Sequence, residues 1–362
     1  MQSRDICVVV QGPVSGTQSD PPHQRLTARC LRSVRAHLPD AEIILSTWKG
    51  SDVDELDYDR LVESDDPGTM RCDMGTRNGF AAYYNANRQI VSTRNGLAVA
   101  RRPYAIKMRS DMEMTGTGFL ELFERYPVRA PQWRILGQRV VTADHFSRSL
   151  DRRIPYVFHP SDWFHFGRHE DVVALWDIDF ASEEMVRWYD SHPRPREDPD
   201  WWLSHRFTVE QHNWLSFLSR HAGDHALRVD HKADVSGQNR MLSELTIVNN
   251  LVIAEAGELG IAFLKYPVQL HSTAMLYTHG EWRRLYQRYC DANRTPPHDW
   301  KLWGRRLYDA YIAQAHLLLS SPRSSPRLGA VSSAWQRRAP ASFQLVKRAY
   351  LSGLGLLGRR PH

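Results

Sequence analysis

The stretch "YAIKMRSDMEMTG", residues 104–116, passes from apolar residues into a sudden cluster of charge. Tyr104, Ala105 and Ile106 are typical of a buried strand. Two carboxylates, Asp111 and Glu113, follow where that strand should end. In sheets of parallel strands, ligands bind outside the carboxyl ends of the strands. The stretch therefore predicts a sheet edge that carries a polar binding site.

The rest of the chain alternates between strand and helix patterns, which predicts an α/β fold with a mostly parallel sheet flanked by helices. Strand patterns cover residues 6–11, 41–47, 58–64, 104–108 and 261–270, and helix patterns cover 24–38, 80–101, 208–222, 243–260 and 281–319. Residues 133–180 mix short strand patterns with aromatic loops, and 320–342 have the Ser, Pro and Arg content of a linker.

These patterns predict one large domain, residues 1–319, followed by a basic linker and tail, residues 320–362. Within the large domain we expect three parts, at about 1–116, 117–280 and 281–319, of which the last is helical.

The net charge of +6 comes from the tail, which carries eight Lys and Arg residues and no Asp or Glu. A body without its own basic excess argues against nucleic acid as a partner. Clustered cations are attracted to anionic head groups, so the tail predicts contact with the inner-membrane surface. The alternative is a disordered tail that only improves solubility.

The four cysteines have no CxxC spacing, which fits a reducing cytosol. The N-terminus lacks the pattern of a secretory signal, and no apolar run reaches the roughly 18 residues of a membrane span. We expect a cytoplasmic protein, and the tail adds the alternative of peripheral attachment to the cytoplasmic face of the inner membrane.

Asp111 and Glu113 have the chemistry to hold a hard divalent cation, Mn²⁺ or Mg²⁺, that bridges the phosphates of a ligand. Lys107 and Arg109 alternate along the same strand and would add positive charge on one face. His271, beyond a late strand pattern, is a further candidate metal ligand. The alternative is a solvated loop whose charges have no ligand.

The stretch "NANRQIVST", residues 85–93, opens the helix that leads into this strand. The side chains of Asn87 and Arg88 can bind a base, a ribose or a phosphate. Helix capping together with a surface ion pair explains them equally well.

The densest mixture of aromatic and polar residues is "PYVFHPSDWFHFGRHEDV", residues 155–172. Its histidines, His159 among them, do not follow a zinc-ligand spacing. Trp163 and its aromatic neighbours form either an apolar wall for a sugar, with Asp162 binding a hydroxyl, or a buried aromatic corner.

Glu210 lies in the first turn of a predicted helix, residues 208–222. A carboxylate there is a candidate general base for an acceptor hydroxyl, with Asp162 as the second candidate. The alternative is an acidic residue that only stabilises the helix N-terminus.

Four stretches occur in an order that resembles the WavE lipopolysaccharide-synthesis family and, more broadly, the GT-A glycosyltransferases. They are "VVVQGPV" (8–14), "CLRSVRAHLPDAEIILSTWKGSDVD" (30–54), "NRQIVSTRNGLAVA" continued by "YAIKMRSDMEM" (87–100 and 104–114) and "PSDWFHFG" (160–167). The resemblance covers roughly residues 5–290. It implies a GT-A-like, Rossmann-type transferase that moves a sugar from a nucleotide-sugar donor to a lipid-linked or oligosaccharide acceptor of lipopolysaccharide core, O-antigen or capsule. In such an enzyme residues 1–116 would form the nucleotide-binding part and residues 117–280 the acceptor part.

The resemblance also implies roles for individual residues. Gln11, Gly12 and Pro13 would line the nucleotide, while Trp48 and Asp52 would hold the base and ribose. Asp111 with Glu113 would occupy the metal and diphosphate position, and Glu210 the position of the catalytic base.

The chain departs from the usual pattern where Thr47, Trp48 and Lys49 precede the "GSD" turn in place of an acidic pair. Two other functions therefore stay open. One is a sugar nucleotidyltransferase, which the absence of a Gly-rich loop after the first strand disfavours. The other is a non-catalytic carbohydrate-binding subunit of a polysaccharide assembly complex.

Overall fold

A computed structural model of the chain describes residues 1–362 apart from 17–19, 22–23, 75–80, 152–154, 197, 199–201, 224–227, 265–275, 296–314, 316–317, 320–325 and 358–362. The chain divides into two compact units. The first comprises Met1–Pro267 and Leu276–Pro297, and the second comprises Val268–Met275 and His298–His362.

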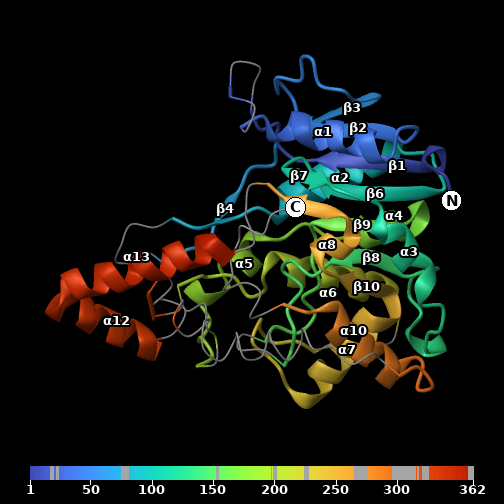
Figure 1. Ribbon diagram of the computed structural model, residues 1–362. Coiled ribbons are helices and arrows are strands. Elements are labelled where there is room, and N and C mark those ends of the chain that lie inside the picture. Colours follow the sequence, from blue (N-terminus) through green and yellow to red (C-terminus); the bar gives the residue numbers. More distant parts are fainter. Residues whose placement is uncertain are drawn as a thin grey trace. The chain divides into compact units, whose positions relative to one another are not determined.

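The first unit is built on a seven-stranded sheet with the strand order β10-β8-β9-β6-β1-β2-β3 (Figure 1). Its strands are β1 (Ile6–Gln11), β2 (Glu42–Trp48), β3 (Arg60–Ser64), β6 (Tyr104–Arg109), β8 (Val140–Ala143), β9 (Phe164–Arg168) and β10 (Leu251–Ala254). Only β9 runs antiparallel to its neighbours, β6 and β8. The predicted α/β class, with a mostly parallel sheet and flanking helices, is confirmed.

Helices α2 (Ala86–Val99) and α4 (His169–Trp176) pack against the sheet and against each other. Helix α2 approaches β1 so closely that a Cβ atom at Gly96 would lie 2.4 Å from Val9 Cγ1. Helix α3 (Gly118–Arg125) packs on β8 and β9, where the rings of Phe119 and Phe166 meet at 4.8 Å. Helix α1 (Leu26–His37) contacts β1 and the short strand β7 (Met112–Met114).

Strand register places three polar side chains beneath α2 and α4. Lys107 pairs with Val9 on one side and with His165 on the other, and Gln11 pairs with Arg109. Because side chains alternate between the two faces of a sheet, Gln11, Lys107 and His165 share one face. That face is the one that α2 and α4 cover, since Gln11 contacts α2 while Lys107 and His165 contact α4.

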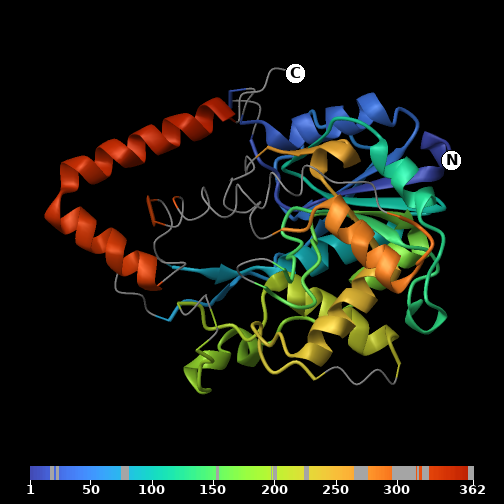
Figure 2. The same ribbon diagram turned by 60° about the horizontal axis from the view of Figure 1, so that its bottom comes forward.

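Smaller elements surround this sheet (Figure 2). Strand β11 (Ile261–Phe263) pairs with β7, and β4 (Met70–Arg71) pairs with β5 (Tyr83–Tyr84). The remaining elements of the first unit are η1 (Ser3–Asp5), η2 (Pro131–Trp133), α5 (Glu183–Val186), η3 (Trp188–Asp190), α6 (Val209–His221), α7 (Gly237–Asn250), α8 (Ala256–Leu259) and α10 (His279–Tyr289).

Two of the sequence-based assignments in the first unit are wrong. The helix expected over 243–260 is interrupted by strand β10, a short apolar run whose four residues are all buried. Periodicity cannot distinguish such a run from a buried helical segment. The helix expected from residue 80 begins at Ala86, because Tyr83 and Tyr84 pair with β4 instead.

The described part of the second unit contains α12 (Pro326–Arg338) and α13 (Pro340–Leu357). Residues 326–338 were expected to be linker, but Pro326 stands at the first position of α12, where proline is tolerated. The two helices contact each other through Trp335 and Phe343, whose rings meet edge-on at 5.4 Å. In the part of the chain that the structure describes, we find no helix with the length and apolar character of a membrane span.

Candidate active site

Three neighbouring parallel strands, β2, β1 and β6, end at one edge of the sheet, and the segment Gln11–Pro13 lies at this edge. Gln11 Oε1 accepts a hydrogen bond of 2.7 Å from the Ser92 hydroxyl of α2. Gly12 has a φ of 118°, and a Cβ atom there would lie 3.3 Å from Ser110 Oγ. The Ser110 hydroxyl donates to the Pro13 carbonyl at 2.7 Å. The predicted nucleotide-binding loop is therefore held in place by neighbours from α2 and β6.

Asp111 and Glu113 each contact a different arginine. Arg109 donates to both carboxylate oxygens of Asp111, at 2.8 and 2.7 Å, and its guanidinium lies 4.1 Å from the centre of the Trp163 ring. Glu113 accepts a bond of 2.8 Å from Arg29 of α1. The predicted pair of metal ligands is thus divided between two ion pairs.

This donor set does not fit the expected divalent cation. Both oxygens of Asp111 face the guanidinium of Arg109, and the side chain of Asp111 is only 8% exposed. Among the residues that the structure describes, no three His, Cys, Asp or Glu side chains converge as a metal site would require. His271 lies outside the described residues.

Three predicted ligand-binding residues have structural contacts. The side chain of Asn87 donates to the Ala181 carbonyl at 3.1 Å and accepts from its N–H at 2.8 Å. Arg88 forms an ion pair with Asp66, with Nε 2.7 Å from Oδ1. Asp52 accepts a bond of 3.3 Å from the N–H of residue 54. The observed contacts are structural: Asn87 attaches α2 to the backbone of Ala181, Arg88 forms an ion pair, and Asp52 stabilises a turn.

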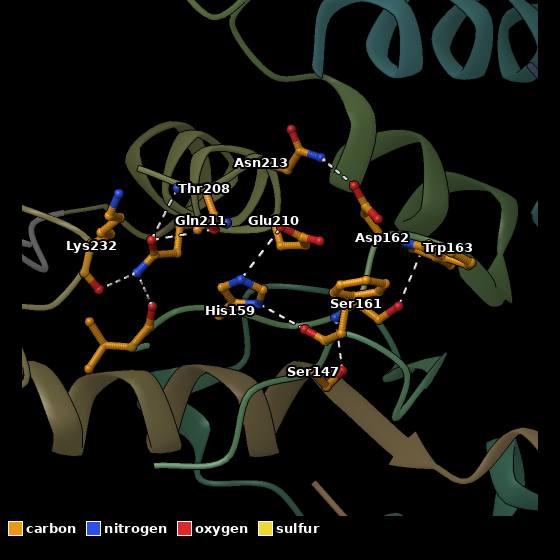
Figure 3. A network of polar contacts seen from close by, with 12 residues as sticks. Ser147, His159, Ser161, Asp162, Trp163, Thr208, Glu210, Gln211, Asn213 and Lys232 are labelled. Atoms are coloured by element: carbon orange, nitrogen blue, oxygen red, sulfur yellow. Dashed lines mark hydrogen bonds and ion pairs between the residues drawn. The ribbon is translucent and has the colours of Figure 1, made fainter. Parts of the chain in front are cut away.

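Asp162 and Glu210, which are far apart in the sequence, are brought together. Asp162 lies just before β9, whose antiparallel direction places its first residue, Phe164, opposite Met108 near the end of β6. Glu210 lies in the first turn of α6, and Asn213, one turn further along, donates to Asp162 Oδ2 at 3.3 Å. Figure 3 shows the Glu210 side chain between the ring of His159 and Asp162.

The start of α6 is fixed by a capping box. The Thr208 hydroxyl accepts from the N–H of Gln211, and Gln211 Oε1 accepts from the N–H of Thr208, both at 3.2 Å. The Gln211 amide also donates to the carbonyls of Val157 and Lys232, at 2.8 and 3.0 Å (Figure 3). These bonds attach the first turn of α6 to the loop that carries Asp162.

Asp162 and Glu210 line the same small cavity, of about 20 Å³, which is large enough for one water molecule. It is lined by Pro160, Ser161, Asp162, His165, Leu175, Trp176, Glu210, Asn213, Trp214 and Leu251. Asp162 Oδ1 and Asn213 Oδ1 are buried and have no hydrogen-bond partner among the described residues. Such groups retain an unsatisfied capacity to bind water or a ligand hydroxyl.

Burial raises the pKa of both carboxyl groups. For Asp162, burial outweighs the opposing effect of the cations Lys107 and Arg109. For Glu210, burial and then the nearby charge of Asp162 raise the pKa to about 8. Because the side chain of Glu210 is 14% exposed, it has access to solvent while remaining largely desolvated. At neutral pH the Glu210 carboxyl therefore holds a proton that it releases in mildly alkaline solution.

Lys107 was expected to contact a nucleotide but is fully buried beneath this pair. Its Nζ donates to the carbonyl of Asp162 and lies 4.5 Å from the centre of the Trp176 ring. Burial lowers the pKa of Lys107 to about 7. It lies too deep to contact a bound nucleotide in this structure, and it instead provides the cationic charge beneath Asp162.

The aromatic residues around Asp162 form a buried corner. Phe164 and Phe166 have no exposed surface, and both contact Phe119 of α3, with ring centres 5.5 and 4.8 Å apart. Trp163 is buried beneath the guanidinium of Arg109. An open apolar wall for a sugar is therefore not present at these residues.

Sequence reasoning missed Asn213, His159 and Tyr84 as members of the site. Asn213 follows Glu210 by three residues, a spacing that places two side chains on one side of a helix and was available from the sequence. Tyr84 belongs to β5, and its buried hydroxyl has no partner among the described residues. Glu210 is the largest charge influence on Tyr84, which raises the pKa of that phenol further. No local pattern in the sequence indicates that Tyr84 lies near enough to Glu210 to feel its charge.

Comparisons with known proteins bear on the family. No curated protein gives a significant match. Among solved structures, the crystal structure of 4-diphosphocytidyl-2C-methyl-D-erythritol synthase from Anaerococcus prevotii DSM 20548 aligns with 52% of this chain and 85% of its own, at 10% identity and a TM-score of 0.28. The family model described as WavE lipopolysaccharide synthesis matches residues 6–314. Since this match spans most of the sequence, the chain belongs to the WavE lipopolysaccharide synthesis family.

Proposed function

We propose that this chain is a glycosyltransferase that moves a sugar from a nucleotide-sugar donor to a lipopolysaccharide core, O-antigen or capsule acceptor. The family gives the chain a role in lipopolysaccharide synthesis. The observation that supports transfer chemistry is the pair Asp162 and Glu210, two buried carboxyl groups that influence each other's ionisation at the edge of the sheet. Pairs of this kind supply acid and base groups whose pKa values lie near the working pH.

In the proposed reaction, ionised Glu210 takes the proton of an acceptor hydroxyl. The acceptor oxygen then forms a bond to the anomeric carbon while the bond between that carbon and the diphosphate oxygen breaks. A negative charge on Asp162 makes Glu210 the stronger base, because a like charge nearby favours the protonated form of Glu210. The unpartnered oxygens of Asp162 and Asn213 are available to bind the reacting hydroxyl or a water.

The donor diphosphate would lie at the strand edge beside Gln11–Pro13. Arg109 ends β6 opposite Gln11, and its side chain is 18% exposed, so its guanidinium can reach an anion from this edge. A diphosphate bound there competes with Asp111, because Nε and Nη2 of Arg109 already donate to that carboxylate. No step is assigned to a metal ion, since Asp111 and Glu113 face arginines.

The test is nucleotide release measured with candidate nucleotide-sugars and a deacylated lipopolysaccharide acceptor. We expect free nucleoside diphosphate only when donor and acceptor are both present. Release of pyrophosphate from a nucleoside triphosphate would instead identify a sugar nucleotidyltransferase. Acceptor binding that is unchanged by Glu210→Gln, without any transfer, would identify a carbohydrate-binding subunit.

We also propose that the second unit holds the enzyme at an anionic membrane surface, where a lipid-linked acceptor lies. Val331, Leu345 and Val346 are exposed large apolar residues of α12 and α13. Cations lie beside them in the chain, namely Arg337, Arg338, Lys347 and Arg348, and the two helices contain no Asp or Glu. Exposed apolar residues flanked by cations are typical of helices that lie in a membrane interface.

Flotation with vesicles tests this attachment. We expect binding to vesicles that contain phosphatidylglycerol and none to vesicles of phosphatidylcholine alone. Leu345→Asp should abolish binding, whereas Gln344→Asp, with the same change of charge on the polar side of α13, should weaken it only slightly. Equal losses for both variants would show that apolar insertion has no part in binding.

A further inference from the structure

His159 lies next to Glu210 with its ring fixed in one tautomer. Its Nδ1 is 2.8 Å from the carbonyl oxygen of Phe146, and a carbonyl can only accept a hydrogen bond, so Nδ1 carries the proton. The opposite nitrogen, Nε2, then carries a lone pair, and it lies 3.5 Å from Glu210 Oε2 (Figure 3). A lone pair facing a carboxyl oxygen is favourable only when that carboxyl group holds a proton.

Two residues that position His159, Phe146 and Phe158, have strained backbone conformations. Among the described residues only Glu55, Phe146 and Phe158 are non-glycine residues with positive φ. Phe146, with φ of 65°, provides the carbonyl that fixes the ring, and Phe158, with φ of 55°, immediately precedes His159. Such conformations cost on the order of 1–3 kcal/mol each and cluster at functional sites.

Neighbouring residues hold these strained conformations. The N–H of Phe158 donates to Ser243 Oγ at 2.7 Å, and the N–H of Arg148 donates to the His159 carbonyl at 2.9 Å. The ring of Tyr156 stacks on the imidazole with a centroid distance of 5.7 Å. His159 is therefore held by three separate segments of the chain, so its orientation does not depend on Glu210.

We propose that His159 is a positioning residue that accepts a hydrogen bond from protonated Glu210 and so stabilises the proton that Glu210 takes from the acceptor hydroxyl. The catalytic benefit of this bond rests on the proposed function, whereas the contact between His159 and Glu210 is independent of it. The bond forms only with the acid form of Glu210, so it makes Glu210 a stronger base for the acceptor.

Burial and the charged and titratable groups around the pair together set its protonation state. Asp162 raises the pKa of Glu210, and Arg148 and the Thr208 hydroxyl lower it. Burial and then Arg148 lower the pKa of His159 to about 3, so the imidazole stays neutral. Tyr84, whose own pKa is raised by burial and by Glu210, stays uncharged. Below about pH 8 the favoured state is thus a neutral imidazole facing a protonated carboxyl group.

The test is an infrared titration of the protonated carboxyl band between pH 6 and 10, on the full chain without substrate. Subtracting the spectrum of Glu210→Gln assigns the band to Glu210. We expect a midpoint near pH 8 in the natural sequence and a midpoint lower by about one pH unit, a tenfold change in acidity, in His159→Phe. The control is His212→Phe, which replaces a histidine that lies in α6, and it should leave the midpoint unchanged. An unchanged midpoint in His159→Phe would overturn the inference.

A second measurement needs no variant that must fold. Nitrogen NMR of the natural sequence should show His159 neutral, with its proton on Nδ1, from pH 6 to 8; a proton on Nε2 would overturn the inference. Once transfer is measured, its pH profile in His159→Phe should shift downward with the midpoint of the band. If no transfer is found but the titration behaves as expected, the proposed function fails and the role of His159 stands.

Discussion

Two pairs of carboxyl groups lie near one edge of the sheet, and they differ in what surrounds them. Asp111 and Glu113 are close in sequence, and each is matched by an arginine at 2.7 to 2.8 Å. Asp162 and Glu210 are 48 residues apart, and burial raises the pKa of both. An arginine offsets the charge of each carboxylate in the first pair, whereas burial favours the protonated forms of Asp162 and Glu210. The second pair is therefore the better candidate for acid–base chemistry.

The largest effect that tests this comparison is the loss of transfer in Glu210→Gln. A general base contributes roughly 10²- to 10⁴-fold to a rate, and the amide cannot accept the proton. Glu113→Gln, an equal change in the other pair, should lower turnover less than about threefold. The measurement is nucleotide release with donor and acceptor present. Near-normal turnover in Glu210→Gln would remove Glu210 from the mechanism.

The second prediction concerns pH. Because burial and Asp162 raise the pKa of Glu210 to about 8, the ionised base becomes scarcer below that pH. We expect kcat/KM to rise about tenfold per pH unit from pH 6 and to level off near pH 8, with a midpoint that belongs to the coupled pair. A profile that is flat between pH 6 and 9 would contradict this assignment.

The sheet could be predicted because its strands are continuous apolar runs, as in β1, where all six residues are buried. The strand end at 104–109 was also predictable, and so was a polar edge after it. The ion pairs at that edge could not be predicted, since a sequence does not show that Arg109 turns back onto Asp111 or that Glu113 meets Arg29.

The contact between Asp162 and Glu210 depends on tertiary structure. It requires β9 to run antiparallel beside β6, and it requires Gln211 to attach α6 to the 155–163 loop. Each residue was a candidate from its local motif, but the contact between them was not visible in the sequence. The role of His159 depends on two left-handed phenylalanines, a conformation that phenylalanine rarely adopts and that no sequence pattern indicates.

A third prediction concerns the stability of the paired carboxylate. Asp111→Asn removes the carboxylate that pairs with the guanidinium of Arg109. Breaking a buried pair costs about 3–5 kcal/mol of unfolding free energy, and we expect a somewhat smaller loss here because the Arg109 side chain is 18% exposed. Urea unfolding followed by circular dichroism measures this loss. If the natural sequence instead gains stability from added Mn²⁺ and Asp111→Asn does not, then Asp111 is a metal ligand as the sequence suggested.

The last prediction concerns how the unfolding free energy of Glu210→Gln depends on pH. The unfolded chain releases this proton near the ordinary value of 4.5, while the folded chain keeps it to about pH 8. The favourable contribution of protonated Glu210 to the stability of the folded chain is therefore fully present below about pH 4.5, and it is lost as the pH rises to about 8. Glu210→Gln cannot ionise, so the difference between its unfolding free energy and that of the natural sequence should shift in favour of the variant by up to about 4 kcal/mol from pH 5 to pH 9.

Urea unfolding at the two pH values, with Glu113→Gln as the control, completes the comparison. The ion pair of Glu113 with Arg29 is partly exposed, with side-chain exposures of 28% and 35%, so its removal should cost less than about 1 kcal/mol. A Glu210→Gln variant that is less stable than the natural sequence at pH 9 would mean that the charged carboxylate is well accommodated. Glu210 would then resemble Asp111, and the distinction between a structural and a reactive pair would no longer hold.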